Sequence, residues 1–444
     1  MRFFLMVLLY GCGCAGYARM AVAAEEEFRF FNADHAGGAK QGGPMIQPWR
    51  VVRLDPACGG LWAVAGDLDG DGEPEIVSAE NFNEGDTHYT SAVAAQKLDG
   101  SVLWTWGDPD IGRKSWHHDV ACQVYDWDGD GRNEVVVVAK DAIVELNGAT
   151  GEERRRIPVE EGASDCLVFC NLSGGPRATD VLVKDRYHQI WAYNHEGEQL
   201  WRVENPGGYR TAHQPRPMDI DGDGRDEIMA GYAMLNPDGG VRWVYQSEKV
   251  DLKRGHLDCA RVFRKASSPE DFRIVGTCCG ANNIVMLDGT GKVIWEVPGR
   301  HFESVQVGRV IPGYSGSQVL VDIDHQPKGQ SPVWLIGEEG EPLGQLNTDY
   351  SRHHRLLDWT GDGYDEIVVG STRGLYGADG TCLATLAVPD LVEAASILKA
   401  DMTGDGVPDL LLVTPDMAYV YRNENGRRPE GGFPLGTGVN VTLY

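Results

Sequence analysis

Short apolar runs alternate with polar turns along most of the chain. Three turns show the pattern. The turn at residue 67 is preceded by VAGD and followed by EIVSAE. The turn at 126 lies between CQVYD and EVVVVAK, and the turn at 219 lies between PRPMD and EIMAGY. Short apolar, β-branched runs bounded by Gly, Asp and Asn are typical of strands. Further turns, such as LDGSVLW, LNGATGEE, NHEGEQLW, LDGTGKVIW and EEGEPLG, contain glycine, which gives a tight turn its backbone freedom. The pattern predicts an all-β fold of short antiparallel strands.

An acidic nonapeptide recurs between the first and second strands of these units. Its five copies are DLDGDGEPE from Asp67, DWDGDGRNE from Asp126, DIDGDGRDE from Asp219, DWTGDGYDE from Asp358 and DMTGDGVPD from Asp401. Their first aspartates are 59, 93, 139 and 43 residues apart. The two long gaps correspond to two and three units of about 46 residues, a period that indicates a propeller. The spacing predicts an eight-bladed β-propeller in which three blades have lost the acidic loop; seven blades are the alternative.

The acidic loops predict calcium sites. Oxygen-bearing side chains stand at positions 1, 3, 5 and 9, and glycines at 4 and 6 let the backbone turn. Ca²⁺ takes about 6–8 oxygen ligands in flexible geometry, and without an ion the like charges would repel. The alternative is a solvated acidic turn that binds no ion. The expected ligands are Asp67, Asp69, Asp71, Glu75, Asp126, Asp128, Asp130, Glu134, Asp219, Asp221, Asp223, Glu227, Asp358, Thr360, Asp362, Glu366, Asp401, Thr403, Asp405 and Asp409.

The N-terminus has the features of a secretory leader. Met1 and Arg2 precede the apolar FFLMVLLY, and AVAA ends at Ala24, so residues 1–24 are predicted to be a signal peptide. Residues 25–444 are then one propeller domain, whose last blade either NVTLY at the C-terminus or FRFF from Phe28 could complete. We expect a secreted or periplasmic monomer; a lipid anchor at Cys12 is the alternative. No other apolar stretch is long enough to span a bilayer.

Charge and cysteine content narrow the classes of partner. The formal net charge of −26 argues against nucleic acid or an acidic membrane surface. Much of that charge lies in the acidic loops, so an anionic ligand is not excluded. Eight cysteines follow the leader, and Cys122, Cys166, Cys170 and Cys259 lie in apolar first strands, where we expect core positions. Pairing of the cysteines cannot be deduced from spacing.

Histidines recur in the segments that lead into first strands. These segments are RKSWHH (113–118), YRTAH (209–213), KRGH (253–256), GRH (299–301) and SRHH (351–354). In a propeller they share one end of the ring with the turns between second and third strands, opposite the acidic loops. Those turns add Lys140, Lys184, Arg186, Tyr187, Cys278, Cys279 and His325. A lone histidine in a strand is usually a core residue, but five at equivalent places favour a basic funnel that attracts an anion.

These motifs resemble a known family. The DxDGDGxxE hairpins, the histidines ahead of first strands and KDRYHQIWAY (184–193) are similar to the propeller-type polysaccharide lyases, the rhamnogalacturonan and ulvan lyases. The acidic hairpins alone also occur in integrin-type propellers, so the basic face and the KDRY turn carry the distinction. The resemblance implies β-elimination beside a uronate: a base removes the C5 proton, cations neutralise the carboxylate, and the leaving oxygen receives a proton.

The resemblance to ulvan lyases also implies roles for individual residues. Tyr187 matches their catalytic tyrosine, and a tyrosine held among cations can have its pKa lowered enough to act as base and then as acid. His118 and Lys140 are expected to assist the base and neutralise the carboxylate, and Arg210 to clamp it. For Tyr187 the alternative is an ordinary exposed turn residue. The expected substrate-binding residues are His117, Arg186, Arg254, Arg300, Arg352 and His354.

A zinc site is a second expectation for this face. Mixed cysteine and histidine ligands suit Zn²⁺, and similarity to ulvan lyases implies a structural zinc nearby. The candidate ligands are His213, His256, Cys278, Cys279 and His301. The alternative is a vicinal disulfide between Cys278 and Cys279 in an exported protein.

Together these features predict a secreted polysaccharide lyase that cleaves a uronate-containing acidic polysaccharide by β-elimination. Two other classes stay open. A non-catalytic propeller could bind the same acidic glycan through the same basic funnel. A quinone-cofactor dehydrogenase is suggested by turns such as LDGTGKVIW and by the adjacent cysteines, although the repeated tryptophan signature of that class is not evident.

Overall fold

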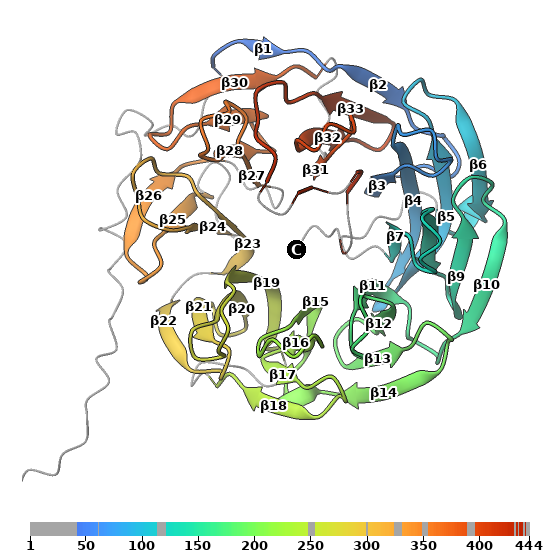
Figure 1. Ribbon diagram of the computed structural model, residues 1–444, viewed down its shortest axis with the longest axis horizontal. Coiled ribbons are helices and arrows are strands. Elements are labelled where there is room, and N and C mark those ends of the chain that lie inside the picture. The colour runs from blue at the N-terminus through green and yellow to red at the C-terminus, as the bar shows by residue number, and fades with distance from the viewer. Residues whose placement is uncertain are drawn as a thin grey trace, which may run out of the picture.

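The chain forms a ring of eight sheets around a central channel (Figure 1). The computed structural model describes residues 42–60, 62–112, 121–246, 254–298, 301–323, 331–348, 354–388, 396–429, 432–433, 435–437 and 440. Within these ranges the helical elements are α1 (Pro109–Gly112) and the 3₁₀ turn η2 (Pro206–Gly208). The eight-bladed β-propeller is therefore confirmed, and the seven-bladed alternative is wrong.

Each blade is an antiparallel sheet whose strands run outwards from the channel in chain order. Blade 1 holds β3 (Trp62–Gly66), β4 (Glu75–Glu84), β5 (Thr87–Gln96) and β6 (Val102–Gly107). Blade 2 holds β7 (Cys122–Tyr125), β8 (Glu134–Val138), β9 (Ala142–Asn147) and β10 (Glu153–Pro158). Blade 3 holds β11 (Asp165–Cys170), β12 (Asp180–Lys184), β13 (Gln189–Tyr193) and β14 (Gln199–Glu204). Blade 4 holds β15 (Thr211–Met218), β16 (Glu227–Gly231), β17 (Ala233–Leu235) and β18 (Val241–Val244).

The second half of the ring follows the same plan. Blade 5 holds β19 (His256–Arg264), β20 (Arg273–Cys279), β21 (Asn283–Asp288) and β22 (Val293–Pro298). Blade 6 holds β23 (Phe302–Gly308), β24 (Gln318–Ile323), β25 (Val333–Ile336) and β26 (Pro342–Leu346). Blade 7 holds β27 (Arg355–Leu357), β28 (Glu366–Val369), β29 (Gly374–Tyr376) and β30 (Cys382–Leu386). Blade 8 holds β31 (Ser396–Ala400), β32 (Asp409–Val413) and β33 (Met417–Tyr421).

An N-terminal strand closes the ring. β2 (Arg50–Arg53) pairs antiparallel with β33 and becomes the outermost strand of blade 8, while β1 (Met45–Ile46) adds to blade 7 parallel to β30. The closing strand is thus RVVR, a segment that we did not predict. FRFF lies outside the described residues, as does NVTLY except for Asn440. That asparagine lies against the innermost strand β11, where its side-chain amide exchanges two hydrogen bonds of 2.6 and 2.7 Å with the backbone of Phe169.

Apolar side chains between neighbouring blades form the core. Both faces of each sheet are covered, so β8, with the sequence EVVVV, is buried at every position. Tryptophans on outer strands then join successive blades through their indole N–H groups: Trp104 donates to the carbonyl of Gly148 at 2.7 Å, and Trp243 to that of Gly289 at 2.9 Å. Gly151, at φ +71°, lies so close beneath Trp104 that an added Cβ would come within 2.5 Å of the ring. Contacts between a tryptophan of one blade and a glycine of the next therefore join successive blades.

One hydrogen bond ends the inner hairpin in seven of the eight blades. The first side chain of the second strand accepts the backbone N–H of the second loop residue, as Glu75 does from Leu68 at 2.8 Å. The other pairs are Glu134 with Trp127, Asp180 with Leu172, Glu227 with Ile220, Gln318 with Val310, Glu366 with Trp359, and Asp409 with Met402. Blades 3 and 6 keep this contact, which we call the hairpin cap, although they have lost the acidic loop. Part of the acidic motif is therefore structural whether or not an ion binds.

Asp180 gives a test of the hairpin cap away from the acidic loops. Its carboxylate accepts the backbone N–H groups of Leu172 and Ser173 and the Ser173 hydroxyl at 2.8–2.9 Å. Asp180→Ala leaves these donors without an acceptor and is expected to lower the free energy of unfolding by about 2–3 kcal/mol. Urea denaturation measures the change. Asp238→Ala, at an exposed turn, is the control, with an expected change within about 0.5 kcal/mol; equal midpoints for both variants would contradict the role of the cap.

Candidate functional site

Tyr187 lies against two guanidinium groups at the end of the ring opposite the acidic loops. The Arg186 Cζ is 4.9 Å and the Arg210 Cζ 4.7 Å from the centroid of the Tyr187 ring. The rings of His213 and His256 contact the same side chain, with centroids 5.8 and 5.1 Å away. Blades 3, 4 and 5 thus bring together a phenol, two arginines and two imidazoles, as the funnel hypothesis predicted.

The KDRY turn is held by its own aspartate. The Asp185 side chain accepts the backbone N–H groups of Tyr187, His188 and Gln189 at 3.1, 2.6 and 2.8 Å. Aspartate commonly stabilises turns in this way, because its short side chain reaches the backbone a few residues on. The turn between β12 and β13 is therefore fixed locally, which directs Tyr187 towards blades 4 and 5.

Asp165 anchors the cations on one side of Tyr187. Its carboxylate lies 3.1 Å from the Lys184 Nζ, 3.7 Å from the Arg186 guanidinium and 3.5 Å from the His88 Nδ1. Lys184 is fully buried and also donates to the carbonyl of Arg186 at 2.8 Å. His88 comes from the long β4–β5 hairpin of blade 1, which reaches across to blade 3. The sequence analysis missed both Asp165 and His88, since neither belongs to a repeated pattern.

Asp258 anchors the histidines on the other side. Its carboxylate lies 3.5 Å from the His213 Nε2, 3.1 Å from the His256 Nε2 and 3.8 Å from the His301 Nε2. The His301 Nε2 is also 3.3 Å from the Cys279 Sγ. The set His213, His256 and Asp258 and the set Asp258, Cys279 and His301 each bring three ligand atoms within 4.8 Å of one another. Four of the five predicted zinc ligands thus gather around an aspartate that the sequence analysis missed.

Cys278 is the predicted ligand that the structure excludes. It is 1% exposed and packs in the apolar core between blades 4 and 5, because successive side chains of a strand point to opposite faces. Burial raises the pKa of its thiol well above the ordinary value. Cys278 and Cys279 are both free thiols, so the vicinal disulfide alternative is wrong. Cys122, Cys166, Cys170 and Cys259 are buried, as predicted.

The protonation of His256 indicates a place for a cation. Its Nδ1 lies 2.8 Å from the carbonyl of Arg254 and must donate the proton there, because a carbonyl only accepts. Burial, together with the charges of Arg186, Arg210 and Lys184, lowers the pKa of His256 to about 4, so the ring is neutral at pH 7. Its Nε2 lone pair then faces an Asp258 oxygen at 3.1 Å. The His256 Nε2 and the Asp258 oxygen would then both be acceptors with no proton between them, an arrangement that fits a metal ion bound by both atoms.

The other predicted site residues divide into three groups. Arg254 is exposed, and Lys140 lies exposed in the turn between β8 and β9 of blade 2. His354, which we expected to bind substrate, lies directly before β27 and is 2% exposed, with its Nε2 3.8 Å from an Asp322 oxygen. The structure therefore places it in the interior. The predicted residues His117, His118, Arg300 and Arg352 lie outside the described ranges, as does His325.

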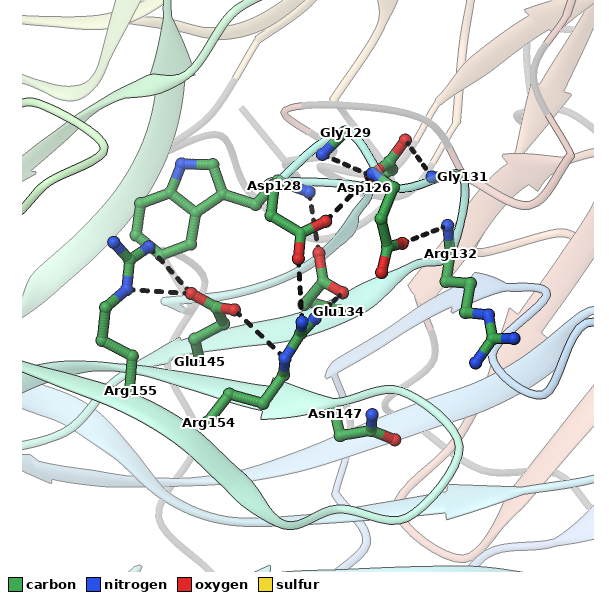
Figure 2. Close-up of polar contacts among 12 residues, drawn as sticks. Asp126, Asp128, Gly129, Gly131, Arg132, Glu134, Glu145, Asn147, Arg154 and Arg155 are labelled. Carbon is green, nitrogen blue, oxygen red and sulfur yellow. Dashed lines mark hydrogen bonds and ion pairs between the residues drawn. The ribbon is translucent and has the colours of Figure 1, made fainter.

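The acidic loops lie at the opposite end of the ring, and Figure 2 shows how the carboxylates converge in the loop at 126. Asp126 accepts the backbone N–H groups of Gly129 and Gly131 at 2.8 and 3.2 Å. Arg154 reaches in from β10, with 2.9 Å to an Asp128 oxygen and 2.7 Å to a Glu134 oxygen. A cationic side chain therefore offsets part of the charge repulsion, which we had attributed to an ion alone.

Two other loops repeat this arrangement. Lys97 contacts Asp69 and Asp71 at 2.6 and 2.8 Å, and Arg242 contacts Asp221 and Glu227 at 2.9 and 2.7 Å. Burial raises the pKa of Glu75, and likewise of Glu134, to about 7. The ligand atoms of three carboxylates lie within 4.8 Å of one another in each loop: Asp67, Asp69 and Asp71; Asp126, Asp128 and Glu134; and Asp219, Asp221 and Glu227. Such oxygen clusters fit a hard divalent cation.

Comparisons with known proteins find similarity to one enzyme family, the rhamnogalacturonan lyases. Residues 61–157, which cover blades 1 and 2, match the family model described as rhamnogalacturonan lyase family 11, C-terminal domain. The rhamnogalacturonan exolyase YesX of Bacillus subtilis (strain 168) is 25% identical over 436 residues, which span 80% of this chain and 69% of YesX. The rhamnogalacturonan endolyase YesW of the same organism is 24% identical over 482 residues, which span 87% and 72%.

A solved structure supports the fold. The rhamnogalacturonan lyase PL11 of Bacillus licheniformis superposes with a TM-score of 0.59 at 19% identity, over 84% of this chain and 75% of that one. The comparisons confirm the predicted similarity to propeller-type polysaccharide lyases. Among the described residues, no helix is both long and apolar enough to cross a membrane.

His354 predicts a pH dependence of stability. Burial, with a smaller effect of Arg355, lowers the pKa of its imidazole from 6.5 to about 3. The native state therefore favours the neutral ring: the stabilisation is complete above the unfolded pKa and is lost as pH falls towards the folded pKa. Between pH 6.5 and about pH 4, the wild type is expected to lose on the order of 3 kcal/mol more unfolding free energy than His354→Gln. Denaturation curves at each pH measure this difference; His188→Gln, at an exposed site, should follow the wild type. Parallel profiles for wild type and His354→Gln would contradict it.

Proposed function

We propose that this chain, a propeller-type polysaccharide lyase by its similarity to the rhamnogalacturonan lyases, cleaves a rhamnogalacturonan-type polymer by β-elimination beside a uronate. The observation that carries the proposal is the contact of Tyr187 with Arg186 and Arg210, and with the two imidazoles of blades 4 and 5. The substrate class is supported by the similarity to YesX and YesW, which are named as rhamnogalacturonan lyases.

The arginines suit the carboxylate of a uronate. The C5 proton is acidic enough to remove only when cations neutralise the adjacent carboxylate, since negative charge then spreads into it in the transition state. The Arg210 Nε is buried and has no hydrogen-bond partner among the residues that the structure describes. A buried N–H without a partner costs free energy, which a bound carboxylate would recover. We assign Arg210 and Arg186 to this clamp.

Tyr187 is the proposed base and acid. Its phenolate takes the C5 proton, the electron pair of the C5–H bond forms the C4–C5 double bond, and the C4–O bond breaks towards the leaving oxygen. The phenol then returns a proton to that oxygen, so protons and electrons balance without a co-reactant. The guanidinium groups against the ring stabilise the negative charge by Coulomb attraction in a partly water-excluded site. Lys140 and His118 keep their predicted assisting roles as part of this proposal.

Tyr187→Phe tests the mechanism. The variant keeps the ring beside the arginines but removes the proton carrier, so turnover on rhamnogalacturonan is expected to fall about 10²–10⁴-fold. The ultraviolet absorbance of the unsaturated uronate measures the rate, and thermal melting checks the fold. Tyr364→Phe, in an acidic loop at the other end, is the control and should retain wild-type turnover. Undiminished activity of Tyr187→Phe would remove Tyr187 from the mechanism.

The same assay separates the other function classes. Retention on immobilised rhamnogalacturonan, without any unsaturated product from the wild type, would favour a non-catalytic binding propeller. A bound chromophore with reversible redox absorbance would favour a quinone-cofactor dehydrogenase. Parallel incubations with ulvan and polygalacturonate show which uronate polymer the site accepts.

The proposal includes a structural zinc ion held by donors from His213, His256, Asp258, Cys279 and His301. Nitrogen, sulfur and carboxylate donors together suit Zn²⁺ better than harder cations. Glu303 lies 3.4 Å from the His301 Nδ1, the kind of outer contact that orients a ligating histidine. A bound zinc would supply positive charge and fix the imidazoles that contact Tyr187.

Zinc content and melting temperature test this site together. We expect about one zinc per chain by elemental analysis of the purified protein, with a lower melting temperature after treatment with 1,10-phenanthroline, because metal binding stabilises the folded state. Cys279→Ser is expected to lower the zinc content, whereas Cys382→Ser, a free thiol in blade 7, should not change it. Equal zinc content in wild type and Cys279→Ser would argue against this ligand set.

The proposal also includes Ca²⁺ at the five acidic loops, supported by the converging carboxylates of the loops at 67, 126 and 219. Treatment with EGTA is expected to lower the melting temperature by several degrees, and added Ca²⁺ to restore it, because ion binding stabilises the folded state by mass action. Asp126→Asn should reduce the effect. An unchanged melting temperature after EGTA would mean that Lys97, Arg154 and Arg242 hold the loops without an ion.

Export completes the proposal. Extracellular calcium is high enough to fill weak loop sites, and a polymeric substrate must be met outside the cell. The leader, residues 1–24, and the alternative anchor at Cys12 lie outside the described residues, so secretion and the monomeric state stay predictions.

A further inference from the structure

β-bulges occur at the start of the first strand in blades 3 to 6, which supply most residues of the candidate site. The pairing of first and second strands shifts register after Asp165 in blade 3, Thr211 in blade 4, Leu257 in blade 5 and Phe302 in blade 6. Over the described parts of blades 1, 2, 7 and 8, the same two strands pair without a shift. Because a bulge re-aims a side chain and is frequent next to active sites, these bulges point to a role in the site.

The bulge of blade 3 is strained. Asp165 pairs with Lys184 and Leu167 with Val183, so Cys166 is the extra residue between them. Its φ is +65°, in the left-handed region that few residues other than glycine adopt, and no other non-glycine residue in a described strand has a positive φ. The Cys166 side chain is 1% exposed and packs in the core between blades 3 and 4. Backbone strain of this kind clusters at functional sites.

Asp165, the residue before Cys166, faces two permanent cations. Its carboxylate lies 3.1 Å from the Lys184 Nζ and 3.7 Å from the Arg186 guanidinium group. Lys184 is fully buried, whereas Arg186 is 16% exposed and also contacts the Tyr187 ring. One carboxylate therefore opposes two positive charges, and the nearer and more deeply buried Lys184 is its principal partner. Arg186 keeps charge for a second anion.

The long hairpin of blade 1 covers the Asp165 carboxylate from another side. Its strands β4 and β5 have 10 residues each and reach blade 3. There the His88 Nδ1 lies 3.5 Å from Asp165, and the Ser164 hydroxyl donates to the His88 carbonyl at 2.7 Å. His88 and Asp165 are 5% and 1% exposed, so little water reaches the carboxylate. Charge interactions are stronger where water is excluded, so the position of Arg186 is sensitive to the charge of Asp165.

We propose that Asp165 is a positioning residue of the lyase reaction, an inference that rests on the proposed function. Before substrate binds, Asp165 holds Arg186 against Tyr187. The uronate carboxylate then competes with Asp165 for the guanidinium group, while Lys184 continues to balance the Asp165 charge. Arginine suits this exchange, because its five N–H donors match carboxylates in a fixed fork. The strained bulge at Cys166 keeps Asp165 within reach of both cations.

Two substitutions of Cys166 test the bulge. Glycine adopts the left-handed backbone without strain, whereas a β-branched valine does not. We expect kcat of Cys166→Gly to stay within about twofold of the wild type and kcat of Cys166→Val to fall about tenfold or more, since small displacements in an active site slow the reaction strongly. Cys170→Val is the control: this buried cysteine lies in the same strand without a positive φ, and kcat should not change. Thermal melting checks that each variant is folded.

Asp165→Asn separates positioning from a merely structural role. Without the negative charge Arg186 is more available to the uronate, so KM is expected to fall about threefold or more. Over the same comparison kcat is expected to fall about tenfold or more, because the guanidinium group is no longer held against Tyr187. A purely structural loss would lower kcat without tightening binding. If the unpaired Lys184 prevents this variant from folding, the comparison of Cys166→Gly with Cys166→Val decides.

Calorimetry with a saturated rhamnogalacturonan oligosaccharide, in the Tyr187→Phe background, measures affinity without turnover. Adding Asp165→Asn to that background is expected to tighten binding. Equal, weaker or absent binding would overturn the proposal, as would equal kcat values for Cys166→Gly and Cys166→Val. A wild type that binds the oligosaccharide but releases no unsaturated product would instead contradict the lyase activity.

Discussion

The rest of the structure depends on the hairpin cap, the hydrogen bond between the first side chain of each second strand and the backbone N–H of the second loop residue. It occurs in seven blades, with glutamate, aspartate or glutamine as the acceptor. Because it ends the inner strand at the same place each time, equivalent residues of neighbouring blades come to one level of the channel. The gathering of histidines from successive blades at one end of the ring follows from this alignment.

At each end of the ring, charged side chains are paired with side chains of opposite sign. At the acidic end, Arg154 bridges Asp128 and Glu134, and Lys97 and Arg242 do the same in their blades. At the funnel end the signs are exchanged, since Asp165 holds Lys184 and Arg186, while the carboxylate of Asp258 lies among three histidines. A buried charge is tolerated only when it is paired. These partners therefore hold the arginines and imidazoles in place around Tyr187.

The sequence could reveal those site residues that recur at equivalent positions of successive blades. His213, His256 and His301 precede first strands of successive blades, so their period predicted a shared face, and Tyr187 stood out through the KDRY motif. Asp165, Asp258 and His88 were missed because a single polar residue in an apolar strand has no periodic signal. Cys278 was assigned to the zinc site because it is next to Cys279 in the sequence. Successive side chains of a strand point to opposite faces, so Cys278 points into the core instead. His354 follows the histidine pattern but is covered by its neighbours.

The amino-acid sequence by itself determined the all-β class, the count of eight blades, the inner hairpins that carry the acidic loops and the end of the ring where basic residues gather. These follow from local periodicity and repeat spacing, which the chain carries along its length. Only the tertiary structure decided that Arg50–Arg53 closes blade 8, that Asp258 lies at the centre of the histidine cluster, and that Asp165 and His88 lie together beside Tyr187's turn. Such contacts join residues from different blades, and their distances are set by closure of the ring, which no local pattern encodes.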